Sequence, residues 1–318
     1  MKKKTSNGLL IILFLAGLSL LLYPFIANEW NTYRQSKLIS TYEQVLEEKI
    51  EEIDYSAEWD RANAFNEALL PSILPDSFAI AAASDEPDKE YMACLNLTDD
   101  GMMGFVEIPK INIKVPIYHT VSDEVLQKAA GHLEGSSLPV GGENTHAVIS
   151  AHRGLPSAAL FTDLDRLKEG DHFLLHVLDK TLCYEVDQIT VVEPEDTDAL
   201  AVIEGEDYVT LLTCTPYGVN SHRLLVRGHQ VPYEPKVIEK EEANVINTSL
   251  HTNYLLWVIV GLLITGGFIA ALFVLEGKRR KRNAVVAVLQ KETLAFDEVP
   301  EESLNNEEDL KETKEKEQ

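Results

Sequence analysis

Two long apolar segments enclose most of this 318-residue chain and constrain what it can fold into. They cover residues 8–27 and 254–275, and each is about as long as a helix that spans a bilayer. The first segment could instead be a cleaved signal peptide, but no small-residue cleavage site follows it. Trp30 and Tyr33 are typical of residues that anchor a helix at the membrane interface. We therefore expect two transmembrane helices.

Basic residues beside the two segments indicate how the chain is oriented. Lysines occupy residues 2–4, and lysines and arginines fill residues 278–282. Because positive charge next to a span stays on the cytoplasmic side, we expect both termini in the cytoplasm and residues 28–253 outside. The sequence thus predicts a two-pass protein of the cell membrane, with the lipid bilayer as a partner. The formal net charge of −24 argues against nucleic acid as a partner.

The pattern of apolar residues predicts helices first and strands later in the outward part. Residues 38–70 show helical spacing up to Pro71, and residues 71–100 have the composition of a loop. Short helices are expected at 123–130 and 159–167. Short apolar or alternating runs predict strands at 104–108, 113–118, 146–151, 173–178, 182–192, 208–213 and 224–228. This density of strands favours a mainly β fold, a barrel or a sandwich, with small helical insertions.

The resulting plan has seven regions along the chain. They are a cytoplasmic N-terminus (1–7), a transmembrane helix (8–27), N-terminal helices with a loop segment (28–100), a β domain (101–235), a juxtamembrane linker (236–253), a second transmembrane helix (254–275) and a basic, then acidic, cytoplasmic tail (276–318). Residues 292–318 are acidic with few apolar side chains, so we expect disorder there. The tail is either simply solvated or a docking site for another protein.

A cysteine and an arginine flank one turn in the β region. An apolar run ends at Cys214, a turn rich in Pro, Gly and Asn follows, and Arg223 opens the next apolar run. If the two runs pair as a hairpin, the thiol lies beside a permanent positive charge, which favours the thiolate. Arg223 could be an ordinary solvated arginine, or its donors could stabilise an oxyanion.

The other two cysteines are expected to be small buried hydrophobic residues. These are Cys94 and Cys183; a bridge between them would leave Cys214 free, but nothing in their spacing requires one. The chain has no Cys-x-x-Cys pair and no His-Glu-x-x-His motif, so we expect no metal and no cofactor.

A reactive thiol needs a basic partner, and two histidines are candidates. His152 follows the buried-type strand that ends at Ala151, which suits a site assembled from strand ends, whereas His222 is the rival because it precedes Arg223 directly. The remaining histidines are expected to be surface or structural residues: His119, His132, His146, His172, His176, His229 and His251.

Several stretches of this sequence resemble the sortases, the cysteine transpeptidases of Gram-positive cell surfaces. Residues 210–226 resemble the sortase active-site signature, and residues 104–111 and 115–119 resemble the start of the sortase barrel. Residues 131–139 and 145–154, the Cys-Thr-Pro-Tyr-Gly run at 214–218 and the two apolar segments resemble class C, the pilus-assembling sortases. The resemblance covers residues 90–232 closely.

This resemblance implies a fold, a site and an activity. The fold would be a closed β-barrel of about eight strands with the site at one end. Cys214 would be the nucleophile, His152 the acid and base, and Arg223 the residue that stabilises the oxyanion or positions the substrate. The enzyme would cleave an LPxTG-like sorting signal between Thr and Gly and transfer the acyl group to a pilin lysine. Its partners would be pilin subunits and surface proteins that carry such signals.

Class C members typically carry an Asp-Pro-aromatic lid over the site, and Asp76-Ser77-Phe78 is the nearest match here. The resemblance implies that Asp76 meets the catalytic arginine and that Phe78 covers the cysteine. Ser77 replaces the usual proline, so lid closure is expected to be looser. The rival placement at residues 85–87 lacks an aromatic, and the segment could also be an ordinary loop.

Two alternatives to pilus assembly stay open from the sequence. One is a housekeeping sortase that attaches surface proteins to a peptidoglycan precursor. The other, from a different class, is a non-catalytic membrane receptor whose outer domain binds a ligand and whose Cys214 is unreactive.

Overall fold

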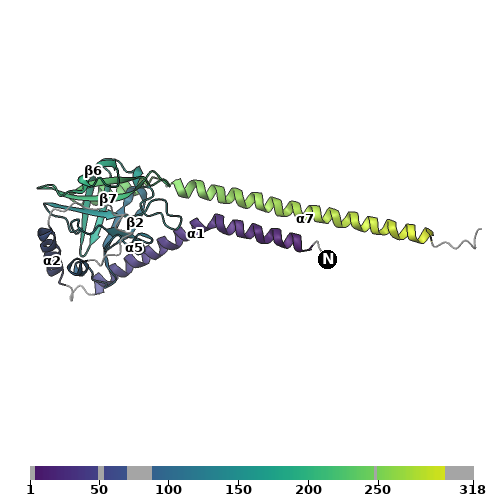
Figure 1. Cartoon of the computed structure of the whole chain (residues 1–318), viewed down its shortest axis with the longest axis horizontal. Coiled ribbons are helices and arrows are strands. Elements are labelled where there is room, and N and C mark those ends of the chain that lie inside the picture. The colour runs from purple at the N-terminus through teal and green to yellow at the C-terminus, as the bar shows by residue number, and fades with distance from the viewer. Residues whose placement is uncertain (1–3, 49–53, 70–87, 247–248, 298–318) are drawn as a thin grey trace, which may run out of the picture. The chain divides into compact units, whose positions relative to one another are not determined.

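A computed structural model of the chain describes residues 4–48, 54–69, 88–246 and 249–297. The chain divides into two compact units, residues 1–252 and residues 253–318. The first unit holds all of the strands and most of the helices. Figure 1 shows these strands gathered into one barrel, with α2 beside it.

Eight strands close the barrel in the order β1-β2-β3-β4-β7-β8-β6-β5. The strands are β1 (Met102–Ile108), β2 (Ile113–Tyr118), β3 (Ala130–His132), β4 (Thr145–Ser150), β5 (His172–Val177), β6 (Lys180–Val192), β7 (Asp207–Thr215) and β8 (His222–Val231). Closure comes from the antiparallel pairing of β1 with β5, in which Val106 lies opposite Leu175. The predicted closed barrel of about eight strands is therefore confirmed.

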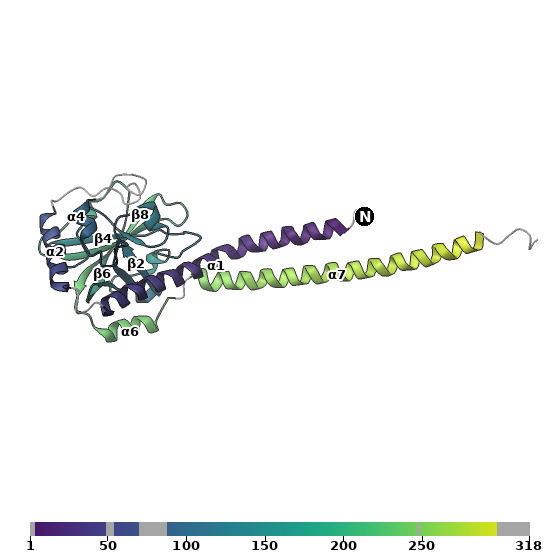
Figure 2. The ribbon, with the colours of Figure 1, turned by 90° about the horizontal axis from the view of Figure 1, so that it is seen from below.

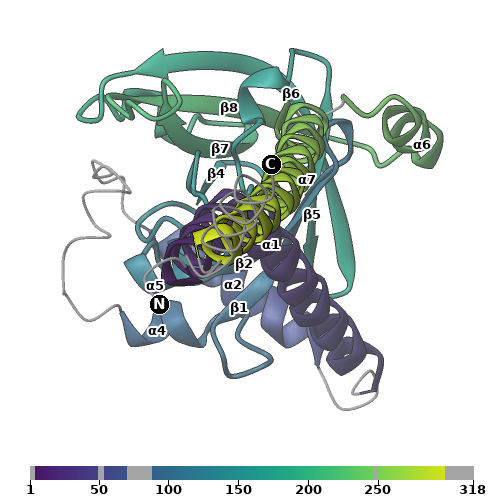
Figure 3. The same ribbon diagram turned by 90° about the vertical axis from the view of Figure 1, so that its right-hand side faces the viewer.

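Two of the strand pairs are parallel, namely β2 with β3 and β4 with β7. Every residue of β4 is buried, including the polar Thr145, His146 and Ser150, so both faces of this strand are covered. The barrel interior is filled by one large apolar cluster that includes Ile149, Leu211 and Val226. Figure 3 shows β4, β7 and β8 side by side, the arrangement on which the candidate site is built.

The sequence predictions missed β3 and misplaced some local helix. β3 has only three residues with Gly131 at its centre, which is too short to show a period of two. The helix expected at 123–130 is the single-turn α5 (Asp123–Leu126). The helix expected at 159–167 is wrong: turns occupy most of it and end in the 3-10 turn η2 (Leu164–Arg166).

The N-terminal helix α1 (Lys4–Glu48) is continuous through the first apolar segment and the amphipathic residues that follow it. The sequence predicted one helix at 8–27 and another beginning near residue 38, but in the structure both belong to α1 without a break. Beyond the span, Ile39 and Tyr42 pack on β1. The Tyr42 hydroxyl donates to the Met103 carbonyl at 3.2 Å and accepts from the Leu178 N–H at 2.9 Å. These contacts join the helix to the barrel.

Two further helices lie beside the barrel, α2 (Tyr55–Ala68) and α4 (Lys89–Ala93), as Figure 2 shows. In α2, Trp59 packs in the core and its indole N–H donates to Asp179 at 2.7 Å. The helix α4 corrects the prediction that residues 71–100 form only a loop. Its N-cap is Asp88, whose side chain accepts the N–H groups of Glu90 and Tyr91.

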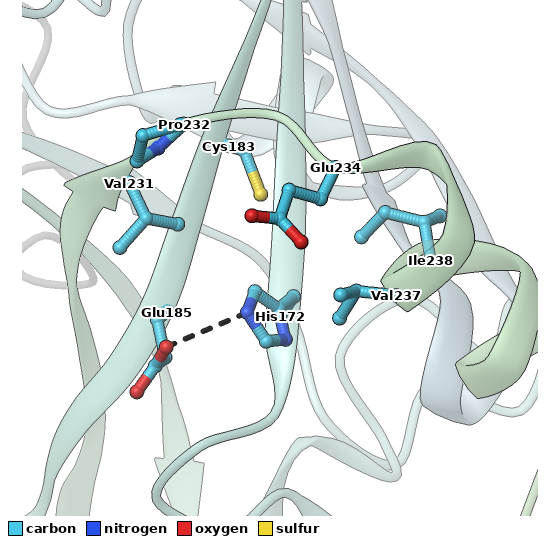
Figure 4. Close-up of a pocket in the computed structure, with 8 residues that line it drawn as sticks. All are labelled: His172, Cys183, Glu185, Val231, Pro232, Glu234, Val237 and Ile238. Carbon is cyan, nitrogen blue, oxygen red and sulfur yellow. Dashed lines mark ion pairs between the residues drawn. The ribbon is translucent and has the colours of Figure 1, made fainter.

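A helix in the expected linker, α6 (Pro235–Ala243), packs on the barrel and bounds a cavity of about 240 Å³. Figure 4 shows this cavity, which is lined by His172, Cys183, Glu185, Val231, Pro232, Glu234, Val237 and Ile238. His172 lies between two carboxylates: its Nδ1 is 2.8 Å from Glu241 of α6, and its Nε2 is 3.6 Å from Glu185 of β6. Chiefly because of the hydrogen bond with Glu241, the pKa of His172 is raised above 6.5.

The second unit consists of the C-terminal part of α7 (Ser249–Asp297). Two helical stretches, Ile12–Glu48 and Val258–Lys291, are long and apolar enough to cross a membrane. The expectation of two candidate membrane helices is confirmed by length and composition. The helix α7 continues through the basic cluster to Asp297, so disorder beginning at residue 292 is wrong for residues 292–297. Residues 298–318 lie outside the described residues.

Candidate active site

The hairpin of β7 and β8 brings a cysteine and an arginine together. Cys214 lies directly opposite Arg223 in the antiparallel register, and Thr215 lies opposite His222. Directly opposed residues in an antiparallel pair project from the same face of the sheet, so the thiol and the guanidinium are neighbours. Both residues are largely buried, with 7% and 9% of their surfaces exposed. The predicted pairing is confirmed.

A histidine reaches the same level of the barrel from β4. The parallel register pairs Ser150 with Leu212, and the Ala151 N–H donates to the Leu212 carbonyl at 3.1 Å. Continued by two residues, this register sets His152 level with Cys214. The hydroxyl of Thr213 donates to the Ala151 carbonyl at 2.7 Å and fixes the end of β4 against β7. The structure therefore brings His152, Cys214 and Arg223 to one end of the barrel.

The surroundings of His152 favour a neutral imidazole, and Arg223 supplies positive charge beside Cys214. Burial lowers the pKa of His152 below its ordinary 6.5, and the charge of Asp123 opposes this shift. A neutral imidazole can accept a proton near neutral pH. The guanidinium of Arg223 favours the anionic form of a neighbouring thiol. Its Nη1 also donates to the His222 carbonyl at 3.3 Å, which helps to hold the side chain in place.

The rival histidine belongs to a different environment. The Nε2 of His222 lies 3.1 Å from Glu193, and its Nδ1 lies 2.8 Å from the Ser221 hydroxyl. Because His222 is opposite Thr215 and one position removed from Arg223, its side chain alternates to the other face of the hairpin. The geometry thus favours His152.

The other two cysteines behave as the sequence predicts. Cys94 and Cys183 are buried, with 0% and 2% of their surfaces exposed, and all three cysteines are free thiols. Burial raises the pKa of Cys183 to about 11 and also raises that of Cys94. The open possibility of a Cys94–Cys183 bridge is excluded in this structure.

Several histidines have structural roles in the barrel wall. His132 is fully buried. Its Nδ1 lies 3.0 Å from the Tyr91 hydroxyl, and its Nε2 lies 2.7 Å from the Ser137 carbonyl. Burial lowers the pKa of His132 to about 4. His146 is buried in the same way, with its Nε2 2.7 Å from the Thr210 hydroxyl. These contacts agree with the structural role expected for both residues.

The lid residues expected from the sequence, Asp76 and Phe78, lie outside the described residues. The chain on either side of them is attached to the β3–β4 connection. Asn66 accepts the Leu138 N–H at 2.7 Å, and the Asp88 N–H donates to Glu134 at 3.1 Å.

One residue that the sequence did not single out is buried next to the site. Arg153 follows His152, and its Nη1 donates to the hydroxyl of Thr215, the residue after Cys214, at 3.0 Å. The signal that could have found it is an arginine between a strand-end histidine and a glycine. Within the part of the chain that the structure describes, no cluster of three or more His, Cys, Asp or Glu side chains has metal-binding geometry.

Comparison with known proteins gives a consistent result. A family model described as the sortase domain matches residues 106–231. Among curated relatives, sortase A of Bacillus anthracis is 27% identical over 161 residues, which cover 50% of this chain and 74% of that protein. Sortase D of Bacillus subtilis is 30% identical over 131 residues, covering 40% of this chain and 63% of that protein. The chain therefore spans less than two thirds of the second relative.

Similar solved structures include several proteins named sortase C. The Streptococcus pneumoniae sortase C, whose structure is described as informative on catalysis and pilin substrate specificity, is 46% identical with a TM-score of 0.54; the match covers 62% of this chain and 97% of that one. Sortase C-1 from Actinomyces oris is 44% identical with a TM-score of 0.52, covering 56% of this chain and 99% of that one. Sortase C1 of Streptococcus agalactiae is 46% identical with a TM-score of 0.53, covering 61% and 95%.

Proposed function

Because the chain belongs to the sortase family, we propose that it is a class C sortase, a membrane-anchored cysteine transpeptidase that joins pilin subunits into polymers. The observation that carries this proposal is the register of three strands. It sets Cys214 opposite Arg223, and the end of β4 sets His152 at the same level. A nucleophile, a base and an oxyanion donor at one end of a barrel are the parts that acyl transfer needs.

In the first half of the proposed reaction, the neutral imidazole of His152 takes the proton of the Cys214 thiol, and the resulting thiolate attacks the carbonyl carbon of the Thr–Gly peptide bond in an LPxTG-like sorting signal. Negative charge develops on the carbonyl oxygen, where the donors of Arg223 stabilise it. The protonated imidazole of His152 donates its proton to the glycine nitrogen as the C–N bond breaks. A thioester between Cys214 and the threonyl carbonyl remains, and the glycine-bearing fragment leaves as a free amine.

In the second half, a pilin lysine amine attacks the thioester. His152, now neutral, takes the proton from the attacking nitrogen, and the C–S bond breaks to return the thiolate. The product is an isopeptide bond between two subunits. Because a proton passes between the thiol and the imidazole at the start and end of the cycle, the pH dependence of the rate belongs to the pair.

The proposed location is the cell membrane, with the barrel outside and both termini in the cytoplasm. It is supported by the lysines at residues 2–4 and the basic cluster at residues 278–282, both of which should stay inside. A sortase held at the membrane would meet pilins and other surface proteins that are themselves still anchored there.

The test of this function is thioacyl capture and polymerisation by the full chain in detergent. Wild-type protein should form a covalent adduct with an LPxTG peptide, seen by mass spectrometry, and should build ladders from a pilin that carries the motif. Cys214→Ala should do neither, whereas Cys183→Ala, which removes a buried thiol, should keep both activities. Full activity in Cys214→Ala would eliminate the proposal.

The acceptor separates this proposal from its two alternatives. A housekeeping sortase would form the adduct and transfer it to a peptidoglycan-type amine without building pilin ladders. A non-catalytic receptor would show no adduct and no reaction of Cys214 with a thiol probe.

The lid stays a proposal that rests on the resemblance of residues 76–78 to the class C motif. Asp76→Ala or Phe78→Ala should speed labelling of Cys214 by a bulky thiol reagent. Unchanged labelling in both variants would remove these residues from a covering role.

A further inference from the structure

The histidine of the site stands at the start of a long connection between β4 and β5, which we name the His152 loop (residues 152–167). Two hydrogen bonds join the first residues of this loop to its middle. The His152 carbonyl accepts the Phe161 N–H at 3.2 Å, and the Gly154 N–H donates to the Thr162 hydroxyl at 3.1 Å. The loop therefore behaves as one ordered piece, and its attachment to neighbouring elements decides where the imidazole stands.

The far part of this loop is attached to α1. The Ala159 N–H donates to the Asn28 side chain at 2.7 Å, and the Asn31 side chain donates to the Ser157 carbonyl at 2.6 Å. These contacts hold the loop from the side of the helix. They lie five or more residues along the chain from His152, so they do not explain what holds the first residues of the loop close to Cys214.

Arg153 makes the near attachment. Its Nη1 donates to the Thr215 hydroxyl at 3.0 Å, and its Nη2 pairs with Asp165 at the other end of the same loop. The bridge thus joins the residue after the histidine to the residue after the cysteine. Only 8% of the Arg153 side chain is exposed, compared with 45% for Asp165.

The chemistry of this bridge suits an arginine alone. The rigid fork of a guanidinium can reach two acceptors in different directions, whereas a lysine ammonium offers a single point of charge on a flexible stem. Among the described residues, the Nε of Arg153 is buried without a hydrogen-bond partner, so the two Nη contacts alone orient the group. Loss of either acceptor would release the side chain.

We propose that Arg153 is a positioning residue that holds the His152 loop against the Cys214 strand and so sets the distance between imidazole and thiol. This inference deepens the proposed function, since it assumes that His152 and Cys214 exchange a proton. Arg153 touches neither the reacting carbonyl nor the thiol in this role. A displacement of about 1 Å between reacting groups can cost about 100-fold in rate.

The first test compares Arg153→Gln and Arg153→Lys with wild type in the full chain. We expect kcat for peptide transfer to fall about 100-fold in Arg153→Gln, with KM within about 3-fold, because alignment and not binding is lost. Arg153→Lys should be only partly active. The control is Arg227→Lys on β8. In the wild type, the Nε and Nη2 of Arg227 donate to the Asp187 carboxylate at 3.0 and 2.8 Å, so this substitution weakens an arginine–carboxylate contact elsewhere in the barrel and should leave kcat near wild type.

The second test needs no sorting signal. The rate of Cys214 alkylation by iodoacetamide is measured against pH. If Arg153 holds the imidazole near the thiol, the profile of Arg153→Gln should move to higher pH, because the thiolate loses its partner. This readout stays valid if the wild-type enzyme fails to use an LPxTG peptide, so failure of the proposed function and failure of the bridge are distinguishable.

A double-mutant cycle with Thr215→Val completes the test. Thr215→Val removes the acceptor and keeps the shape, so the double variant should be no slower than Arg153→Gln alone. Additive losses would overturn the bridge. The proposal would also be overturned if Arg153→Gln kept the wild-type kcat and the wild-type alkylation profile. A lower melting temperature in that variant would then show that Arg153 is a structural residue only.

Discussion

Replacement of Tyr91 by Phe removes one hydroxyl from the middle of a buried polar network. Tyr91 lies on α4 and 1% of its surface is exposed. Its hydroxyl accepts the Thr120 N–H at 3.0 Å and lies 3.0 Å from the Nδ1 of His132. Because the His132 Nε2 faces the Ser137 carbonyl at 2.7 Å, that nitrogen carries the proton, and the Nδ1 accepts from Tyr91.

The loss leaves two buried groups without this partner. A buried donor or acceptor that loses its hydrogen bond costs about 1–3 kcal/mol, so the Thr120 N–H and the His132 Nδ1 together cost about 2–6 kcal/mol. Thr120 has a φ of 64°, an uncommon conformation for a β-branched residue, and the bond from its N–H helps to hold it there. At about 2–4 °C per kcal/mol for a domain of this size, the melting temperature should fall by about 4–24 °C.

The assay is thermal unfolding of the full chain in detergent, followed by circular dichroism. The control is Tyr233→Phe, which removes the same hydroxyl from a ring that is 47% exposed and should change the melting temperature by about 1 °C or less. A melting temperature for Tyr91→Phe that matches the control would refute the claim that this hydroxyl satisfies two buried groups.

Two further changes test the packing around β5 and α6. The pKa of His172 is raised, chiefly by its hydrogen bond with Glu241, so this contact stabilises the fold fully below pH 6.5 and loses its effect as pH rises through the raised value. Glu241→Gln should therefore reduce the fall of the melting temperature as pH rises above 6.5. An unchanged slope in this pH range would show that groups other than His172 and Glu241 cause it. Gly228→Ala places a Cβ 2.7 Å from the ring of Phe173, so it should destabilise the barrel by about 1–3 kcal/mol in urea unfolding. Wild-type stability would show that the ring can move aside freely.

Local patterns in the sequence were sufficient for a large part of this protein. The two apolar segments are long enough to indicate their helices without knowledge of any partner. Seven of the eight strands are close to their predicted ranges, since runs of apolar and β-branched residues between turn residues carry that information locally. The nearness of Cys214 to Arg223 was also predictable, because one short turn connects them.

Other features were local but too weak to read. Residues 89–93 form a helix of five residues, shorter than any periodic pattern can establish. The continuity of α1 past the first apolar segment was hidden because the helical pattern changes there from apolar on all sides to apolar on one face.

The sequence by itself determined which residues can react, and the tertiary structure decided which of them meet. Ser150 and Leu212 pair in parallel although they are far apart in the chain, and this pairing sets His152 level with Cys214. Parallel pairing needs a long crossover, so no local pattern encodes its register. The burial of Arg153 against Thr215 depends on the same register. The proposed nucleophile, Cys214, can therefore be located from its own strand, whereas its nearness to His152, and that of Arg153 to Thr215, are set only when distant strands close the barrel.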